Sequence, residues 1–262
     1  MDEAVKKGVL EDMQKFLDEH EWYKARGIPY KRGYLLDGPP GTGKSSFCLS
    51  VAGLYELDIY ILNLSSLGDS GLAKLFTQLP QRCVVLLEDV DAVGLDRKNA
   101  SAKQTQTDAT CHGVSLSGLL NVIDGVGSQE GRILIMSTNH IDHLDEALIR
   151  PGRVDKTIVF KCADKKIAAQ LFCIIFKQTT TGYEQPAKEA EDVAIETLAE
   201  EFAARVPEEE FSPAKILSFL VEHKHSPADA VDRVQEWVTN QQKEGKEASS
   251  MLERENSWVK DE

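Results

Sequence analysis

The sequence has 262 residues, 42% of them apolar and 28% charged, which is enough to build the buried core of one or two domains and disfavours a chain that is disordered throughout. Asp and Glu outnumber Lys and Arg by 43 to 30, and the resulting net charge of -13 disfavours nonspecific binding to the phosphates of nucleic acids. The five cysteines include no C-x-x-C pair, so the common zinc and redox spacings are absent and reduced thiols in an intracellular compartment are expected.

The first 32 residues are predicted to form an amphipathic helix followed by a linker. Apolar residues recur at helical spacing at Val9, Leu10, Met13, Phe16 and Leu17. Residues 22–31 lack this periodicity, so we expect an irregular linker there. No run approaches the roughly 18 apolar residues that cross a bilayer. The first residues resemble neither a secretory signal nor a transit peptide, and the chain as given is expected to be soluble.

Residues 33–162 alternate short apolar runs with helical patterns. The runs that we expect to be strands cover residues 34–36, 59–64, 84–87, 133–137 and 157–160. Helical patterns lie between them, at residues 45–54, 72–79 and 116–123. This alternation predicts an α/β domain, with a mostly parallel sheet and helices on both of its faces. The polar stretch 96–113 is expected to be a surface loop, whose Cys111 and His112 have no second pair nearby to complete a metal site.

From residue 163 to residue 240 the pattern is purely helical and predicts a small all-helical second domain. Asp164, Ser212 and Ser226 stand at helix starts, and the two serines precede proline, which is the preferred start chemistry. Residues 241–262 are charged and poor in apolar residues, so a disordered tail is expected.

A phosphate-binding loop follows the first predicted strand. Residues 38–45 read G-x-x-x-x-G-K-S between a strand and a helix, the context that confirms this motif. Glycines let backbone N–H groups curl around an anion, and the helix N-terminus adds partial positive charge. Lys44 is expected to reach the β- and γ-phosphates of a nucleotide, and Ser45 to ligate magnesium. The predicted nucleotide-binding residues are Gly38, Pro39, Pro40, Gly41, Thr42, Gly43, Lys44, Ser45 and Ser46.

Polar side chains also follow two other predicted strands. The strand 84–87 ends in Glu88 and Asp89, where one carboxylate would hold magnesium and the other would activate the attacking water. By strand position Glu88 falls at the metal side and Asp89 at the water, and both join Ser45 as candidate metal residues. Asn139 ends the strand 133–137, where an amide can hydrogen-bond the γ-phosphate and the water.

The segment 144–155 carries two arginines, Arg150 and Arg153. With the motifs above, it resembles the AAA ATPases, in which the matching arginines point at the nucleotide of the neighbouring subunit. A guanidinium there neutralises charge on the transferred phosphoryl group and can contribute about 10³ to 10⁵ in rate. The resemblance implies a P-loop NTPase fold of the AAA type with a helical lid, ATP and Mg²⁺ as cofactors, and a homo-oligomeric ring.

The match narrows to the bcs-type AAA ATPases. It rests on residues 22–36, on the order Glu88 then Asp89, on SLSGLLNVIDG at 115–125 and on FSPAKI at 211–216. Most AAA ATPases have Asp before Glu, and the reversed order is expected within this branch. The branch is typified by the mitochondrial inner-membrane chaperone that translocates the Rieske iron–sulfur protein during assembly of respiratory complex III.

This branch supplies further expectations. It implies a heptamer where most AAA rings are hexamers, a protein cargo for which the Rieske protein is the candidate, and a place on the matrix side of the mitochondrial inner membrane. Its members carry an N-terminal membrane helix and a middle domain that the sequence does not contain. We expect an excised ATPase region rather than a paralogue without the anchor, with membrane attachment only through the missing segment.

The function expected from these residues is that of a ring-forming ATPase, which hydrolyses ATP to remodel or translocate a protein cargo. One alternative is an ATP-binding switch or scaffold with little turnover. A less favoured alternative is a phosphate-loop kinase, although Arg205 and Arg233 match no kinase lid motif. Tight ATP binding with slow hydrolysis would favour the switch, and phosphorylated product without matching free phosphate would favour the kinase.

Overall fold

The computed structural model describes residues 3–92, 113–124, 130–177 and 186–258, and it divides into two compact units, Met1–Lys161 and Cys162–Glu262. The expected loop at 96–113 therefore lies almost wholly outside the described residues, together with Cys111 and His112. Within the described ranges, no helix is long and apolar enough to cross a membrane.

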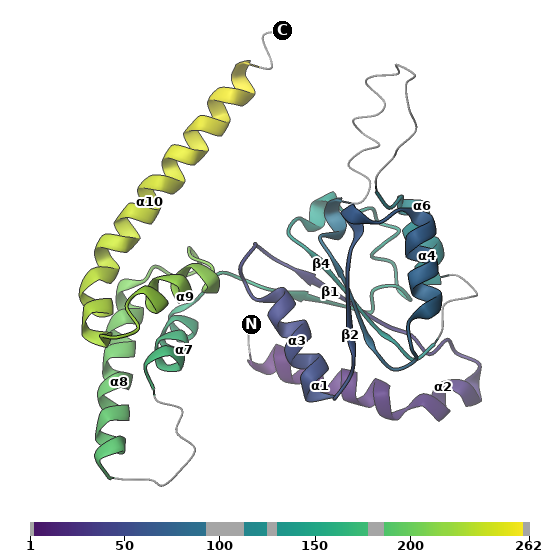
Figure 1. The fold of residues 1–262 in the computed structure, drawn as a ribbon, viewed down its shortest axis with the longest axis horizontal. Helices are drawn as coiled ribbons and strands as arrows, with labels where there is room; N and C mark the ends of the chain where they lie inside the picture. The colour runs from purple at the N-terminus through teal and green to yellow at the C-terminus, as the bar shows by residue number, and fades with distance from the viewer. Residues whose placement is uncertain (1–2, 93–112, 125–129, 178–185, 259–262) are drawn as a thin grey trace. The chain divides into compact units, whose positions relative to one another are not determined.

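The first unit is an α/β domain built on a parallel sheet (Figure 1). Within the described residues its strands are β1 (Arg32–Asp37), β2 (Ile59–Asn63), β3 (Val84–Glu88), β4 (Ile133–Thr138) and β5 (Lys156–Val159). They lie in the order β2-β3-β4-β1-β5, so β1 is paired on both sides. All five predicted strands are present, and the predicted fold class is confirmed.

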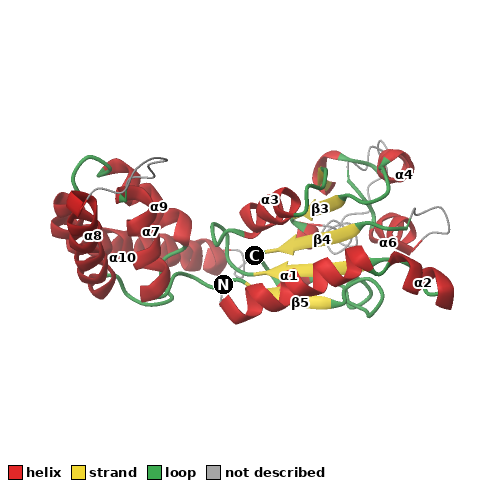
Figure 2. Cartoon of the chain, turned by 90° about the horizontal axis from the view of Figure 1, so that it is seen from below, coloured by secondary structure: helices red, strands yellow, loops and turns green. Residues whose placement is uncertain are grey.

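Helices cover both faces of this sheet (Figure 2). They and the short 3-10 turns are α1 (Glu3–Asp18), α2 (His20–Arg26), α3 (Lys44–Leu54), η1 (Leu64–Ser66), α4 (Asp69–Gln78), η2 (Val90–Ala92), α6 (Leu116–Asp124) and η3 (Ile141–His143). Successive β1 side chains point to opposite faces. Tyr34 and Leu36 join one core cluster with α1 and α3, and Leu35 joins another with α4 and α6.

The N-terminal segment is more helical than the sequence predicts. Helix α2 occupies the first part of the expected linker, and it ends at Gly27, whose φ of 61° lets the chain leave the helix in the left-handed region. The Arg26 guanidinium lies 4.1 Å from the centre of the Trp22 ring. Tyr30 is buried, donates a hydrogen bond to the Phe16 carbonyl at 2.8 Å, and so holds the segment against α1.

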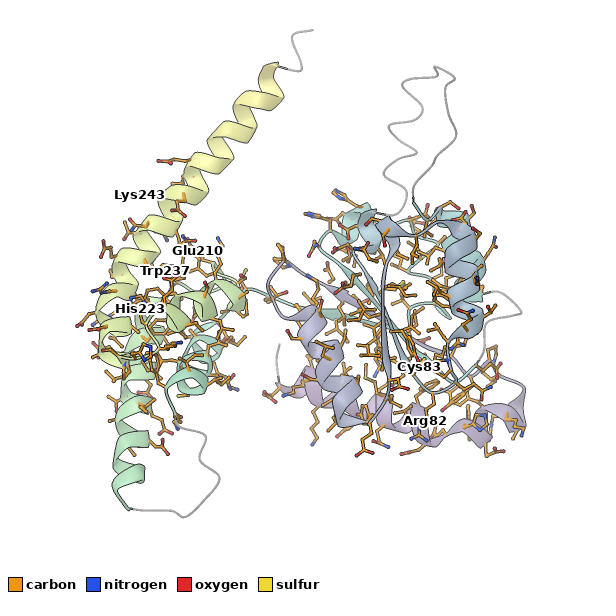
Figure 3. All side chains as sticks on the ribbon, viewed as in Figure 1. Arg82, Cys83, Glu210, His223, Trp237 and Lys243 are labelled. Atoms are coloured by element: carbon orange, nitrogen blue, oxygen red, sulfur yellow. The ribbon has the colours of Figure 1, made fainter. Side chains whose placement is uncertain are left out.

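The second unit is helical, as predicted. Its helices are α7 (Lys165–Phe176), α8 (Pro186–Arg205), α9 (Pro213–Glu222) and α10 (Pro227–Trp258). Asp164 caps α7 by accepting from the Ile167 N–H at 2.7 Å. Trp237, labelled in Figure 3, lies on α10. Its ring packs 4.9 Å from that of Phe211 and 5.0 Å from that of Phe219. These aromatic contacts hold α9 and α10 together.

The last helix continues to Trp258, whereas its charged, apolar-poor sequence predicts a disordered tail from residue 241. The segment lacks proline and is rich in Glu and Lys, which are good helix formers. The low apolar content of the segment led to the prediction of disorder. A polar segment can nevertheless continue a helix whose first half is packed in the core.

Candidate functional site

The phosphate-binding loop joins β1 to α3 at the carboxyl edge of the sheet (Figure 1). Its glycines Gly38, Gly41 and Gly43 have φ values of 148°, 76° and 96°, which L side chains rarely adopt. A Cβ on Gly38 would stand 2.0 Å from the Phe160 carbonyl oxygen, so this position has no room for a side chain. The loop conformation therefore favours glycine at positions 38 and 43, where the motif requires it, and also at position 41.

Lys44 begins α3 and is nearly buried, with 8% of its surface exposed. Its ammonium group donates to the carbonyl oxygens of Gly38 (2.5 Å) and Pro39 (3.0 Å) and to Asn139 Oδ1 (2.8 Å). Burial lowers the pKa of Lys44 below its ordinary value of 10.5, although nearby carboxylates attract the charge. The lysine is thus held in place by its own loop and by the end of β4.

Two side-chain pairs complete the site. Ser45 donates a hydrogen bond from Oγ to Glu88 Oε1 at 2.6 Å, and Asn139 donates from Nδ2 to Asp89 Oδ1 at 3.1 Å. Because β3 and β4 are neighbours in the sheet, their carboxyl ends bring Glu88, Asp89 and Asn139 to the edge that also carries the loop. The structure therefore brings together the residues that the sequence predicts for nucleotide, metal and water.

Asp89 has a φ of 50°, an unusual value for a residue other than glycine. Such a conformation costs on the order of 1 kcal/mol and is found preferentially at functional sites. Directly behind it, Asp91 accepts a hydrogen bond from Thr138 Oγ1 at 3.0 Å, and Thr138 Oγ1 in turn accepts from the His140 N–H at 3.0 Å. Asp91 thus fixes the end of β4 beside Asn139, a contact that the sequence alone does not identify.

The residues present fit a nucleotide with magnesium. Positive φ values turn the loop backbone toward an anion, and the first turn of α3 contains no acidic residue to oppose one. Ser45 Oγ and Glu88 Oε1 are hard oxygen donors of the kind that Mg²⁺ prefers. No group of three or more His, Cys, Asp or Glu side chains in the described part of the chain could hold a metal ion. In nucleotide sites Mg²⁺ is generally bound by one or two protein oxygens together with phosphate and water.

Arg150 and Arg153 lie near the amino ends of the strands, opposite to the carboxyl ends that carry the loop. The Arg153 carbonyl packs against Gly33, where a Cβ would stand 1.8 Å from it, and Gly33 is at the start of β1. The loop begins at Gly38, five residues later, which places it about 16 Å away along the strand. Arg150 lies in the same turn, because its carbonyl accepts from the Arg153 N–H at 3.0 Å. The separation is longer than an extended arginine side chain, so neither arginine reaches the loop of its own chain.

The two arginines differ in their surroundings. Arg153 donates from Nε to Asp124 Oδ2 at 2.7 Å and from a terminal nitrogen to the Ala147 carbonyl. Arg150 is exposed, and among the described residues its side chain has no hydrogen-bond or ion-pair partner. The sequence does not indicate Asp124 as the partner of Arg153, because no local pattern shows which carboxylate will face this arginine from 29 residues away.

Comparison with known proteins matches most of the chain. Residues 34–162 match the "ATPase family associated with various cellular activities (AAA)", and residues 165–236 match "Mitochondrial chaperone BCS1-like, ATPase lid domain". The chain is 42% identical over 228 residues to the mitochondrial chaperone BCS1 of Homo sapiens, which covers 85% of this chain and 50% of that protein.

Two other relatives give the same result. Mitochondrial chaperone BCS1 of Bos taurus is 41% identical over 240 residues, covering 90% of this chain and 53% of that protein. Probable mitochondrial chaperone BCS1-B of Dictyostelium discoideum is 36% identical over 262 residues, covering 91% and 54%. The chain thus spans about half the length of the curated relatives that it matches.

Proposed function

The chain belongs to the AAA ATPase family and carries a BCS1-like lid domain, and from this we propose that it hydrolyses ATP to ADP and phosphate with magnesium. The observation that carries the proposal is the convergence of Lys44, the Ser45–Glu88 pair and the Asp89–Asn139 pair at one edge of the sheet. These are the charged and polar groups that positioning and electrostatic stabilisation of a phosphoryl group require.

Each residue has a distinct part in this reaction. The loop N–H groups and the Lys44 ammonium bind the phosphates, while Ser45 Oγ and the Glu88 carboxylate hold magnesium. Bound magnesium neutralises charge on the phosphate oxygens. Asn139 orients the attacking water, and the Asp89 carboxylate accepts its proton as the new oxygen–phosphorus bond forms and the bond to ADP breaks.

The arginines support action between neighbouring copies of the chain. Arg150 and Arg153 are separated from the loop of their own chain by about 16 Å, the length of β1 between Gly33 and Gly38. We therefore propose that they bind the phosphates in an adjacent subunit. Arg150 is exposed and unpaired within the described residues, which suits a group that finds its partner on another chain. The proposed assembly is a closed homo-oligomeric ring, a heptamer by resemblance, since a residue supplied in trans at every site requires a neighbour at every site.

The biological role follows from the relatives. Their names describe mitochondrial chaperones. We propose that this chain likewise uses ATP hydrolysis to remodel or translocate a protein cargo in mitochondria. A Rieske iron–sulfur protein at the inner membrane is the proposed cargo, on the resemblance to the bcs-type branch.

ATP turnover per subunit, measured at increasing protein concentration, tests the proposal. We expect turnover to rise with concentration, to be lost in Lys44→Ala and Asp89→Asn, and to fall at least tenfold in Arg150→Ala at unchanged nucleotide affinity. Normal turnover in Lys44→Ala and Asp89→Asn would contradict the site. Turnover that is independent of concentration and survives both Arg150→Ala and Arg153→Ala would contradict the ring. Tight binding with no turnover in the wild-type chain would favour an ATP-binding switch.

A further inference from the structure

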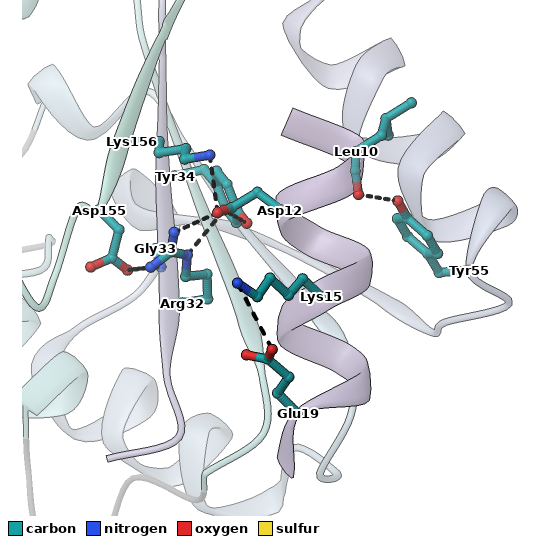
Figure 4. Close-up of polar contacts among 10 residues, drawn as sticks. All are labelled: Leu10, Asp12, Lys15, Glu19, Arg32, Gly33, Tyr34, Tyr55, Asp155 and Lys156. Carbon is teal, nitrogen blue, oxygen red and sulfur yellow. Dashed lines mark hydrogen bonds and ion pairs between the residues drawn. The ribbon is translucent and has the colours of Figure 1, made fainter. Parts of the chain in front are cut away.

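A partly buried ionic cluster joins the N-terminal helix to the sheet, away from the phosphate-binding loop (Figure 4). The Asp12 carboxylate, with 17% of its side chain exposed, accepts from Arg32 Nε at 3.1 Å and Arg32 Nη2 at 2.7 Å. It also accepts from the Tyr34 hydroxyl at 2.7 Å and lies 3.0 Å from Lys156 Nζ. One carboxylate of α1 thus binds residues of both β1 and β5.

The cluster is more than a surface ion pair. The Tyr34 side chain is fully buried, and burial raises its pKa well above the usual range. Burial by itself would raise the pKa of Asp12, but hydrogen bonds from Arg32, Tyr34 and Lys156 outweigh it, so that pKa lies below its ordinary value of 3.8. A charge held this tightly by donors from three positions fixes geometry as well as contributing energy.

The same cluster touches the segment that carries the arginines. Arg32 lies between Asp12 and Asp155, with Nη1 4.0 Å from Asp155 Oδ2. Asp155 is tied to β1 twice, because its carboxylate accepts from the Gly33 N–H at 2.9 Å and its own N–H donates to the Gly33 carbonyl at 2.8 Å. The turn before it is closed at Arg150, whose carbonyl accepts from the N–H of Arg153 at 3.0 Å.

We propose that Asp12 is a positioning residue for the arginines that act on the neighbouring subunit, acting through Arg32 and Asp155. The inference rests on the proposed function, in which these arginines work in trans. It adds that α1 sets their position, so that a shift of the N-terminal helix changes hydrolysis in the adjacent subunit while leaving the phosphate-binding loop of its own chain intact.

The charges explain how Asp12 would act at a distance. The cluster holds two carboxylates, Asp12 and Asp155, against two cations, Arg32 and Lys156. When Asp12 is neutralised, Asp155 is the remaining carboxylate of the cluster for both cations. The attraction of the Asp155 carboxylate to Arg32 and Lys156 then competes with the hydrogen bond that it accepts from the Gly33 N–H. That hydrogen bond anchors the chain just after the turn that carries Arg150 and Arg153.

Mixing two defective chains distinguishes a positioning role from a folding role. Asp12→Asn is expected to lower turnover at least tenfold and to change the affinity for a fluorescent ATP analogue less than twofold. Asp12→Asn keeps a functional phosphate-binding loop, but its Arg150 and Arg153 are misplaced. Lys44→Ala has a defective loop, but its Arg150 and Arg153 are correctly placed. In an equal mixture, turnover per Asp12→Asn subunit should therefore be at least fivefold higher than in Asp12→Asn alone, because half of its functional loops then face correctly placed arginines. Mixtures of Asp12→Asn with Arg150→Ala should not recover, because both variants lack a working arginine.

Three results would overturn the inference, and they can be told apart. Wild-type turnover in Asp12→Asn would show that the cluster does not position the arginines. If Arg150→Ala recovers with Lys44→Ala but Asp12→Asn does not, Asp12 acts within its own chain. If Arg150→Ala also fails to recover with Lys44→Ala, the trans arginine of the proposed function is itself wrong, and the inference falls with it.

A milder variant and a matched control guard against loss of folding. Tyr34→Phe removes only the hydroxyl that donates to Asp12 and keeps the buried ring, so turnover should fall twofold or more. In an equal mixture with Lys44→Ala, turnover per Tyr34→Phe subunit should rise. Turnover of Tyr34→Phe at the wild-type level, together with an unfolded Asp12→Asn, would also reject the inference. Glu11→Gln removes a neighbouring charge of the same helix that is 67% exposed and 3.8 Å from Lys7, and it should leave turnover unchanged.

Discussion

Replacement of Lys44 by methionine should abolish nucleotide-dependent stabilisation while leaving the folded chain nearly as stable as before. The ammonium group makes three hydrogen bonds, each worth about 1.5–3 kcal/mol for a charged donor. Burial nevertheless lowers the Lys44 pKa, which means that the cost of burying the charge exceeds the attraction of Asp89, Asp37 and Asp91. Methionine fills a similar volume without that cost, so we expect the free energy of unfolding without nucleotide to change by about 1 kcal/mol or less.

Nucleotide should then separate the two proteins in a thermal-unfolding assay. ATP with Mg²⁺ at 100 times the Kd stabilises the wild-type chain by about 2.7 kcal/mol, which corresponds to a rise in melting temperature of about 5–10 °C. A hundredfold loss of affinity in Lys44→Met leaves about 0.4 kcal/mol and a rise of about 1 °C at the same concentration.

The exposed Lys74 supplies the control for this measurement, since Lys74→Met should keep the full nucleotide-dependent rise. An undiminished rise in Lys44→Met would refute the assignment of the phosphate site. A loss of more than about 3 kcal/mol without nucleotide would refute the argument that the buried charge is nearly balanced.

Three further predictions concern the sheet and its surroundings. Gly38→Ala should weaken nucleotide binding at least tenfold in a titration, because its Cβ would stand 2.0 Å from the Phe160 carbonyl, whereas Gly53→Ala, where nothing lies within 4 Å, should bind normally. Arg132→Met should lower the free energy of unfolding by about 2–4 kcal/mol in urea, because it removes the donor to three carbonyls at and just beyond the end of α4; a loss below 0.5 kcal/mol would contradict this. Asp12→Asn should be less stable than wild type at pH 5–7 by about 1–3 kcal/mol. The difference should shrink as the pH falls from the ordinary pKa of 3.8 through the lowered pKa of Asp12, because the stabilisation is fully present above the unfolded pKa and is lost through the folded one; a difference that does not shrink as the pH falls through this range would exclude the charge as its cause.

Local patterns account for what the sequence predicts well. The strands and the helices that follow them appear in the sequence as alternating short apolar runs and helical periodicities, and the phosphate loop lies in one contiguous segment. The residues Glu88 and Asn139 could be placed beside that loop, because carboxyl ends of parallel strands share an edge. Each of these inferences needs only neighbouring residues and a general rule of sheet topology.

Pairings across helix faces could not be predicted. Asp12 and Arg32 meet because α1 lies on a face of the sheet that its periodicity does not specify, and Asp124 meets Arg153 for a similar reason. The left-handed conformation of Asp89 likewise has no sequence signal, since aspartate is common in ordinary backbone regions. The side chains that set the positions of the arginines therefore become visible only in three dimensions.

The placement of β1 between β4 and β5 has a consequence for how the chain folds during synthesis. Among the strands of this sheet β1 is the first to leave the ribosome, yet β4, its nearest partner in the sequence, begins about 100 residues later. At about 5–20 residues per second, Leu35 and its neighbours wait on the order of 5–20 s for a hydrogen-bonding partner. The phosphate-binding strand is thus completed late, and a nascent chain that stalls before residue 133 exposes an unpaired apolar strand to chaperones and to aggregation.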